Sequence, residues 1–301
     1  MLISDETIRV VRTVARYQNI TSAAQQLNKV PSAISYTVRK LEEALGVELF
    51  TRKGRYIELT PAGEYFVQHS KSIADDIDAL RRNTALVYDG VEREVTVAFN
   101  NIVPQYVLAD FAADFALAFP ATQLCVTTEV YNGCWDALYA QRADLVVGAP
   151  HAVPRSDGIV SQAIGQMTWD FVVGARHPLA SGDATLRNSE VRGYPAACIR
   201  DTSVDFSPRQ AWLLDGQQPM YLPDFHAAIT LIARNTCIGI LPAYLCRPFL
   251  VSGTLIKKTL LEQKHDTRLF LAWRAEAQGP VRQWCVDYLT RPEVCARLCG
   301  A

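Results

Sequence analysis

The order of elements in the first 60 residues restricts the fold of this chain more than any other feature. Apolar residues recur at helical spacing over residues 5–17, and Thr21 and Ser22 are suitable caps for a short helix that follows. A third helix is expected to begin at Pro31, because proline lacks an N–H that would have no partner there, and to end at Gly46. Two short helices joined by a tight turn predict a helix-turn-helix.

Two short apolar segments follow and flank a basic stretch. Residues 47–50 and 56–59 predict a β-hairpin, or wing, with the basic residues 51–55 at its tip. Hydroxyls and Arg39 on the third helix can reach phosphates or base edges, while the wing places cations on the adjacent backbone. The alternative is a three-helix cap with a solvated polar face, which the ordered combination of elements disfavours. The residues predicted to contact DNA are Thr21, Ser22, Pro31, Ser32, Ala33, Ser35, Tyr36, Arg39, Lys40, Arg52, Lys53 and Arg55.

The net charge of −1 hides an uneven distribution of charge. Residues 1–58 hold nine basic and six acidic residues, a balance of +3, whereas the remaining 243 residues hold 21 and 25, a balance of −4. A positive cluster on a slightly acidic body is compatible with nucleic-acid binding. No apolar run reaches the roughly 18 residues of a membrane span, and the N-terminus has no signal-peptide pattern, so we expect a cytoplasmic protein without membrane contact.

A long helical pattern extends from residue 60 to about residue 88. Seven positions alternate at spacings of four and three, and five of them are apolar, which resembles a coiled-coil seam. A helix of about 29 residues is roughly 43 Å long, too long to bury its stripe against a 60-residue domain. We therefore expect a second copy as its partner; packing against the C-terminal body is the alternative. The predicted dimerisation residues are Phe66, Ile73, Ile77, Leu80 and Val87.

The C-terminal 210 residues alternate between β-rich runs and helical stretches. Runs at 94–100, 124–130 and 144–149, with helical segments at 103–119 and 134–140, predict a βαβαβ unit with parallel strands. A second set follows, with strands at 170–175, 196–199, 220–223 and 237–241, a helix at 225–234, and a final strand and helix at 268–274 and 281–289. Two α/β subdomains with crossings near residues 160 and 266 predict a periplasmic-binding-protein-like fold. Ligands of such sheets bind at the carboxyl ends of the strands, in the cleft between the subdomains.

The N-terminal motifs resemble those of LysR-type transcriptional regulators. They are NITSAAQQL at 19–27, SAIS at 32–35, VRKLE at 38–42, LGVELF at 45–50 and LTPAG at 59–63. The chain departs at Pro31 and Tyr36, where many members carry Gln and Arg, so typical base preferences are not transferred to it. The resemblance implies a double-stranded operator of dyad symmetry and a homodimer or homotetramer, with RNA polymerase as a further partner if the regulator is an activator.

The same resemblance implies three parts. These are a winged helix-turn-helix at 1–59, a linker and dimerisation helix at 60–90, and an α/β effector-binding domain at 91–301. Subdomain I of the last part is expected at about 91–160 and 266–301, and subdomain II at about 161–265. The segments FNNIVP, YNGCWDAL, IRDTS and LPDF are also similar to a branch that contains regulators of purine and ureide catabolism.

Candidate effector contacts lie in loops after the strands. Asn100 and Asn101 are equally well explained as helix caps. Trp135 is better explained as a core residue than as a stacking platform. Thr202 and Ser203 are where family members often bind effector through hydroxyls, and Asp224 and Phe225 border the region by family topology. Because no loop holds a convergent pair of arginines, we expect a neutral or weakly charged effector. The predicted effector residues are Asn100, Asn101, Ile102, Val103, Tyr131, Asn132, Trp135, Ala149, Asp201, Thr202, Ser203, Asp224 and Phe225.

Other functions find less support in the sequence. There is no G-x-S-x-G, phosphate loop, dinucleotide fingerprint or zinc spacing, so we expect no catalytic residues, metal or cofactor. Cys198-Ile-Arg-Asp201 is similar to peroxide-sensing LysR-type regulators, but Ser207 stands where those carry a second cysteine; Cys237 and Cys246 have the nine-residue step in a different element. Redox sensing therefore stays an alternative, as does a solute-binding or enzymatic α/β protein, which the N-terminal domain disfavours.

Overall fold

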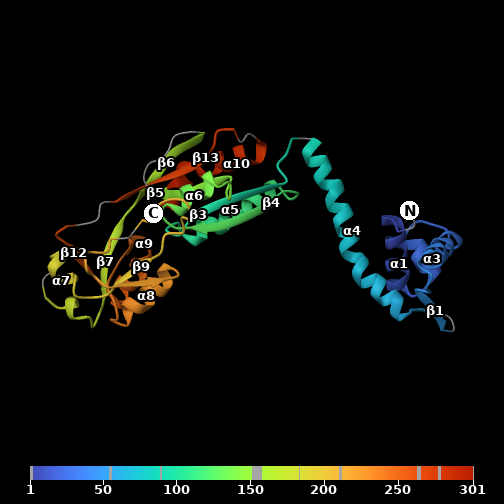
Figure 1. The fold of residues 1–301 in the computed structure, drawn as a ribbon, viewed down its shortest axis with the longest axis horizontal. Helices are drawn as coiled ribbons and strands as arrows, with labels where there is room; N and C mark the ends of the chain where they lie inside the picture. Colours follow the sequence, from blue (N-terminus) through green and yellow to red (C-terminus); the bar gives the residue numbers. More distant parts are fainter. Residues whose placement is uncertain are drawn as a thin grey trace. The chain divides into compact units, whose positions relative to one another are not determined.

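The chain folds into two compact units, Met1–Asp89 and Gly90–Ala301, and each is described here by itself. The computed structural model describes residues 3–53, 56–88, 90–150, 158–182, 184–209, 212–262, 266–276 and 279–300 (Figure 1). Among these residues no helix combines the length and the apolar character needed to cross a membrane.

Three helices form the body of the first unit: α1 (Asp5–Tyr17), α2 (Ile20–Gln26) and α3 (Pro31–Leu45). The predicted limits of α1 and α3 are confirmed, and Gly46 ends α3 in the left-handed conformation at φ 69°. The predicted caps of α2 are wrong. Its cap is Asn19, whose side chain accepts the N–H of Ser22, because Asn19 is extended and can turn its oxygen back on the helix.

The wing consists of β1 (Phe50–Lys53) and β2 (Tyr56–Leu59), which pair antiparallel from Phe50–Leu59 to Lys53–Tyr56. The first strand was predicted three residues too early, so Arg52 and Lys53 lie in the strand and not at the tip. The cause is Leu49, which is buried beneath the helices and precedes the ladder. Arg55 lies outside the described residues.

Helix α4 (Pro61–Tyr88) follows directly, and its first turns pack on the body of the first unit. The junction requires Gly63, because a Cβ there would stand 2.0 Å from the carbonyl oxygen of Leu49. Phe66 and Val67 pack beside Leu49 in the same cluster.

Subdomain I of the second unit is built on a five-stranded sheet in the order β4-β3-β5-β13-β6. The predicted parallel arrangement of β3 (Glu94–Asn100), β4 (Gln123–Glu129) and β5 (Leu145–Pro150) is confirmed. Strand β13 (Thr267–Arg274) runs antiparallel to both β5 and β6 (Ile159–Met167).

Helices cover both faces of this sheet. Residues Val95, Val97 and Phe99 of β3 contribute to the cluster that contains Phe111 and Phe115 of α5. Ala98, on the opposite face, packs in a second cluster with α6. The helices of this subdomain are α5 (Gln105–Ala118), α6 (Gly133–Tyr139), α10 (Pro280–Leu289) and α11 (Pro292–Leu298).

Subdomain II contains a four-stranded sheet in the order β11-β7-β12-β8 and a parallel pair, β9 and β10. The strands are β7 (Trp169–Gly174), β8 (Thr185–Leu186), β9 (Ala196–Ile199), β10 (Pro219–Leu222), β11 (Gly239–Pro242) and β12 (Leu255–Leu260). The helices are the 3₁₀ turn η1 (Pro178–Ala180), α7 (Asn188–Val191), α8 (Phe225–Ala233) and α9 (Ala243–Val251).

The chain first crosses between subdomains later than predicted. Strand β6 stays paired with β13 as far as Met167, which places the crossing at Thr168 and not near residue 160. Strand β6 was not predicted, because most of its side chains are exposed and it lacks a regular apolar pattern. Across the junction, the indole N–H of Trp169 donates to the hydroxyl of Thr267 at 2.9 Å and ties the two crossing strands together.

Candidate nucleic-acid interface and effector site

Helix α3 presents most of the predicted DNA contacts on one exposed face. Its apolar residues Ile34, Val38 and Leu41 are buried, which turns the opposite side of the helix to solvent. Tyr36 is 59% exposed. The other exposed residues of this face are Pro31, Ser32, Ser35, Arg39 and Lys40, whereas Ala33 is half-buried.

The cations of this face share one acidic partner. Arg39 Nε and Lys40 Nζ lie 3.0 and 2.9 Å from the two carboxylate oxygens of Glu43. The hydrogen bond from Lys40 lowers the pKa of Glu43, and the same contact raises the pKa of Lys40. Because all three side chains are exposed, a phosphate can replace Glu43 at little cost.

The wing is fixed to α3 at its base. Glu42 accepts the backbone N–H groups of Leu49 and Phe50 at 2.7 and 3.1 Å. Thr51 and Arg52 are exposed on β1; Lys53 belongs to the same strand. Thr21 is exposed near the start of α2, while Ser22 is half-buried there.

The predicted dimerisation residues fall into two groups. Phe66 packs against the first unit itself, whereas Ile73 and Leu80 of α4 are 46% and 66% exposed, and Ile77 is half-buried. Val87 lies in α4.

A groove of about 750 Å³ lies beside these residues, between α1 and α4. Its charged lining residues are Asp5, Arg9, Arg12 and Arg16 of α1 and Asp75, Asp78 and Arg81 of α4.

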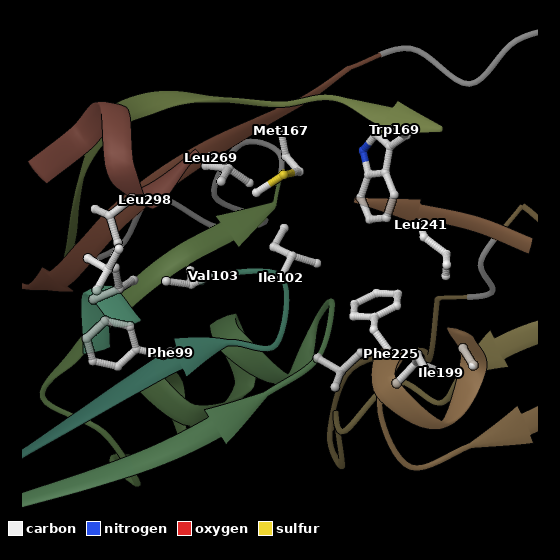
Figure 2. Packing of buried hydrophobic residues seen from close by; sticks show 14 of the residues in the cluster. Phe99, Ile102, Val103, Met167, Trp169, Ile199, Phe225, Leu241, Leu269 and Leu298 are labelled. Carbon is white, nitrogen blue, oxygen red and sulfur yellow. The ribbon is translucent and has the colours of Figure 1, made fainter. Parts of the chain in front are cut away.

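In the second unit, one set of predicted effector residues is apolar and fills the junction of the subdomains. Figure 2 shows Ile102 and Met167 lying between Val103 of subdomain I and Trp169 and Phe225 of subdomain II. All five are buried, and the rings of Trp169 and Phe225 meet edge to face at 6.4 Å. These residues supply packing at the junction.

A second set is polar and lies where α6 meets the loop after β9. Asp201 accepts the backbone N–H groups of Asn132 and Gly133 at 3.2 and 3.1 Å. The hydroxyl of Thr202 accepts the N–H of Val130 at 2.9 Å, and Ser203 is half-buried. The structure therefore brings Asn132, Asp201, Thr202 and Ser203 together.

Three residues of this network were missed from the sequence: Glu129, Asp136 and Arg142. Arg142 pairs with Glu129 at 2.5 Å and with Asp136 at 2.8 Å, and both carboxylates are buried. Burial alone would raise the pKa of Asp136, but hydrogen bonds from Arg142 and from two backbone N–H groups together hold it below the ordinary value. No regular spacing along the chain relates these residues, so only the fold reveals them.

Three more of the predicted effector residues have positions that contacts within the protein explain without a ligand. Asn100 is buried, accepts the N–H of Ile102 and donates to the sulfur of Cys134, so it caps its own loop. The indole of Trp135 is buried and donates to the carbonyl of Pro150. Ala149 is buried in β5.

Three further candidates differ in burial: Asp224 is exposed, whereas Asn101 and Tyr131 are half-buried. Asp224 caps α8 through the N–H of Ala227. Burial raises the pKa of Tyr131 to about 12. Asn101 differs from the others, because its side-chain Nδ2 is buried and has no hydrogen-bond partner among the described residues.

A cavity of about 520 Å³ adjoins Asp201, and two arginines line it. The expectation that no loop holds a convergent pair of arginines is wrong here. Arg209 returns to this cavity because its backbone N–H donates to Asp201 at 2.7 Å, and Arg200 lies over the ring of Tyr221 at 4.9 Å. The lining residues are Cys198, Ile199, Arg200, Asp201, Ser203, Pro208, Arg209, Leu213 and Tyr221.

The three thiols considered for redox sensing are poorly suited to peroxide chemistry. Burial raises the pKa of Cys198 and of Cys237 to about 11, and that of Cys246 to about 12, which keeps these groups in the unreactive thiol form. Among the described residues, no three His, Cys, Asp or Glu side chains gather closely enough to hold a metal ion.

Comparisons with known proteins agree with this arrangement. Residues 6–64 match the bacterial regulatory helix-turn-helix protein, lysR family, and residues 89–292 match the LysR substrate binding domain. The HTH-type transcriptional regulator PunR of Escherichia coli (strain K12) is 35% identical over 286 residues, which cover 95% of this chain and 92% of PunR. The HTH-type transcriptional activator AllS of Salmonella typhimurium (strain LT2) is 31% identical over 293 residues, 96% of this chain and 95% of AllS.

Solved structures show the same fold. A cysteine mutant of Corynebacterium glutamicum OxyR superposes with a TM-score of 0.60 at 16% identity, covering 98% of this chain and 95% of that one. The match of both family models and the identity to full-length relatives establish the assignment that the residues first indicated. The chain belongs to the LysR family and is a transcriptional regulator with a helix-turn-helix unit and an effector-binding domain.

Proposed function

We propose that this regulator binds a dyad-symmetric operator as a homodimer or homotetramer, with α3 in the major groove and the wing on the flanking backbone. The observation that carries this proposal is the single exposed face of α3, on which hydroxyls, Tyr36 and two cations lie together. A helix with this surface can combine base and phosphate contacts. Such a regulator acts in the cytoplasm, where its DNA lies, and we assign it no catalytic activity.

The test of the DNA interface uses the full chain and its operator. Arg39→Ala should weaken operator binding about tenfold or more, because an arginine on this face reads base edges or fixes the helix on phosphate. Lys71→Ala is the matched control, since Lys71 is an exposed cation on α4, away from α3. Equal operator affinities for the Arg39 variant and the wild type would contradict the assignment of α3.

We propose dimerisation through the exposed stripe of α4. Ile73 and Leu80 expose apolar surface that a second copy can bury. The double change Ile73→Asp, Leu80→Asp should convert the dimer to monomers in sedimentation. Leu117→Asp, at a residue of α5 that is 82% exposed, is the control and should leave the linker-helix dimer intact.

The effector is proposed to bind at the junction of the subdomains and to accept a hydrogen bond from Asn101. A buried amide N–H₂ without a partner costs free energy, and a carbonyl or ring nitrogen of a ligand would satisfy it. Purines and ureides have such acceptors, which agrees with the sequence resemblance to that branch. A neutral or weakly charged ligand fits a site at Asn101, because the guanidinium of Arg142 is already paired with two carboxylates. Arg200 and Arg209 line a cavity beside Asp201, and the lining of that cavity does not include Asn101.

A thermal-shift screen of purines, ureides and amino acids against the full chain tests this proposal. A hit should lose its stabilising effect in an Asn101→Ala variant and keep it in Asn188→Ala, whose half-buried side chain lies in α7 and donates to Glu262. Micromolar binding of a polycarboxylate would contradict the neutral class. Loss of that binding in Arg200→Gln, Arg209→Gln would then assign it to the arginine-lined cavity.

A further inference from the structure

Two segments from different subdomains face each other at the effector-domain junction. One runs from the end of β4 into α6, residues 129–136, and belongs to subdomain I. The other is the loop after β9, residues 201–209, and belongs to subdomain II. Each segment contains a buried aspartate, Asp136 in the first and Asp201 in the second.

Asp201 is saturated with hydrogen bonds from both subdomains. Its carboxylate accepts the N–H groups of Asn132 and Gly133 in subdomain I, and those of Ser203 and Arg209 in its own loop at 2.8 and 2.7 Å. Four backbone donors on one carboxylate compensate its buried charge. The same side chain therefore shapes its loop and fastens that loop to subdomain I.

Asp136 makes the reverse connection. From α6 in subdomain I it accepts the N–H groups of Val204 and Asp205 in subdomain II, at 3.3 and 3.0 Å. Arg142 holds the same carboxylate at 2.8 Å. The two aspartates thus exchange backbone donors across the junction, each with the segment that contains the other.

The two segments approach each other closely between the two aspartates. The hydroxyl of Thr202 donates to Glu129 and accepts the N–H of Val130, so its one proton and one of its two acceptor sites are engaged within the protein. A Cβ added at Gly133 would stand 1.9 Å from this hydroxyl oxygen and 2.7 Å from Glu129 Oε2. Only glycine permits the two segments to approach this closely.

We infer that Asp136 and Asp201 form a reciprocal latch that fastens the two subdomains together without ligand, and that an effector acts by competing with it. The competition with an effector rests on the proposed function, whereas the latch itself does not. The latch explains why Thr202 and Asp201, both candidate effector contacts, are already engaged within the chain. Opening it would free hydroxyl, carboxylate and N–H groups at once for an incoming molecule.

Hydrogen exchange of the full chain tests the latch without effector or DNA. Asp201→Asn, in subdomain II, should speed exchange at Asn132 and Gly133 of subdomain I at least tenfold. Asp136→Asn should do the same at Val204 and Asp205. The control Asp215→Asn removes an exposed charge from subdomain II and should change neither segment.

If each aspartate variant speeds exchange only in the segment that contains the substitution, and not in the opposite segment, the latch proposal is wrong. If an aspartate variant does not fold, a second pair of variants tests the latch. Gly133→Ala keeps every charge but forces the segments apart, so it should raise exchange at both 130–136 and 201–209. Gly193→Ala, where a Cβ meets nothing within 4 Å, is its control. Wild-type exchange in Gly133→Ala would equally contradict the latch.

Operator binding then tests the link to regulation. If an effector competes with the latch, Asp201→Asn should change operator affinity with no ligand added, and Gly133→Ala should change it in the same direction. If a variant shows faster exchange in the opposite segment but unchanged operator affinity, the latch is present but has no regulatory role. A failure of this arm is therefore distinct from a failure of the exchange experiment.

Discussion

The two units hold their charged residues in opposite ways. On α3, the exposed side chains of Arg39 and Lys40 both pair with Glu43, which is exposed as well. At the junction in the second unit, Glu129 and Asp136 are buried and share Arg142. Exposed pairs are worth little and are easily exchanged for phosphate, whereas buried carboxylates must keep their partners. The first arrangement suits a surface that binds and releases, and the second suits a fixed joint.

The prediction with the largest expected effect tests whether the cations of the wing belong to the DNA-binding surface. Changing Arg52, Lys53 and Arg55 together to alanine should weaken binding to all DNA sequences, roughly 100-fold at physiological salt. The slope of log affinity against log salt should fall by up to about three, one for each lost phosphate contact. Filter binding over a series of salt concentrations measures both quantities. Unchanged affinity at every salt concentration would remove the wing from the interface.

The next effect concerns Arg142. Arg142→Met should lower the free energy of unfolding of the second unit by about 2 kcal/mol, because it leaves two buried carboxylates without a cation; the half-exposed guanidinium keeps the cost below that of a fully buried pair. Urea unfolding followed by tryptophan fluorescence measures it. Arg192→Met, at an exposed arginine of the same unit, should change stability little. Similar losses in both variants would show that the junction is not a fixed joint.

A pH dependence follows from the lowered pKa of Asp136. Because the folded pKa lies below the unfolded value of about 3.9, the ionised carboxylate stabilises the fold above that value, and this contribution disappears as pH falls through the folded pKa. Arg142 faces Asp136 and also binds Glu129. The stability of the wild type minus that of Asp136→Asn, measured at each pH, isolates the contribution of the Asp136 carboxylate. The difference in stability should be constant from pH 5 to 7 and shrink below pH 4; a difference that does not depend on pH would contradict the assignment.

The same contrast explains what the sequence could predict. Helices α1 and α3 were located to the residue, because apolar periodicity, Pro31 and Gly46 are local signals. Strand β6 was missed, because its partner β13 lies about 100 residues away and its own side chains lack an apolar pattern. The latch could not be predicted from the sequence either, because its hydrogen bonds also join residues that are far apart along the chain. Asp201 was predicted as a contact because it lies in the loop after a predicted strand, but its bonds to Asn132 and Gly133 join residues nearly 70 positions apart.

The smallest expected effect concerns Glu43 and tests the exposed half of the comparison. Glu43→Gln removes the carboxylate that pairs with Arg39 and Lys40, so both cations become available to phosphate without competition. Operator affinity should rise about two- to fivefold at low salt, and the gain should shrink as salt screens the pair. Thermal stability should not change, because all three side chains are exposed. Weaker binding would show that Glu43 itself contacts a base, accepting from a cytosine amino group, and α3 would then read sequence through its acid as well as its cations.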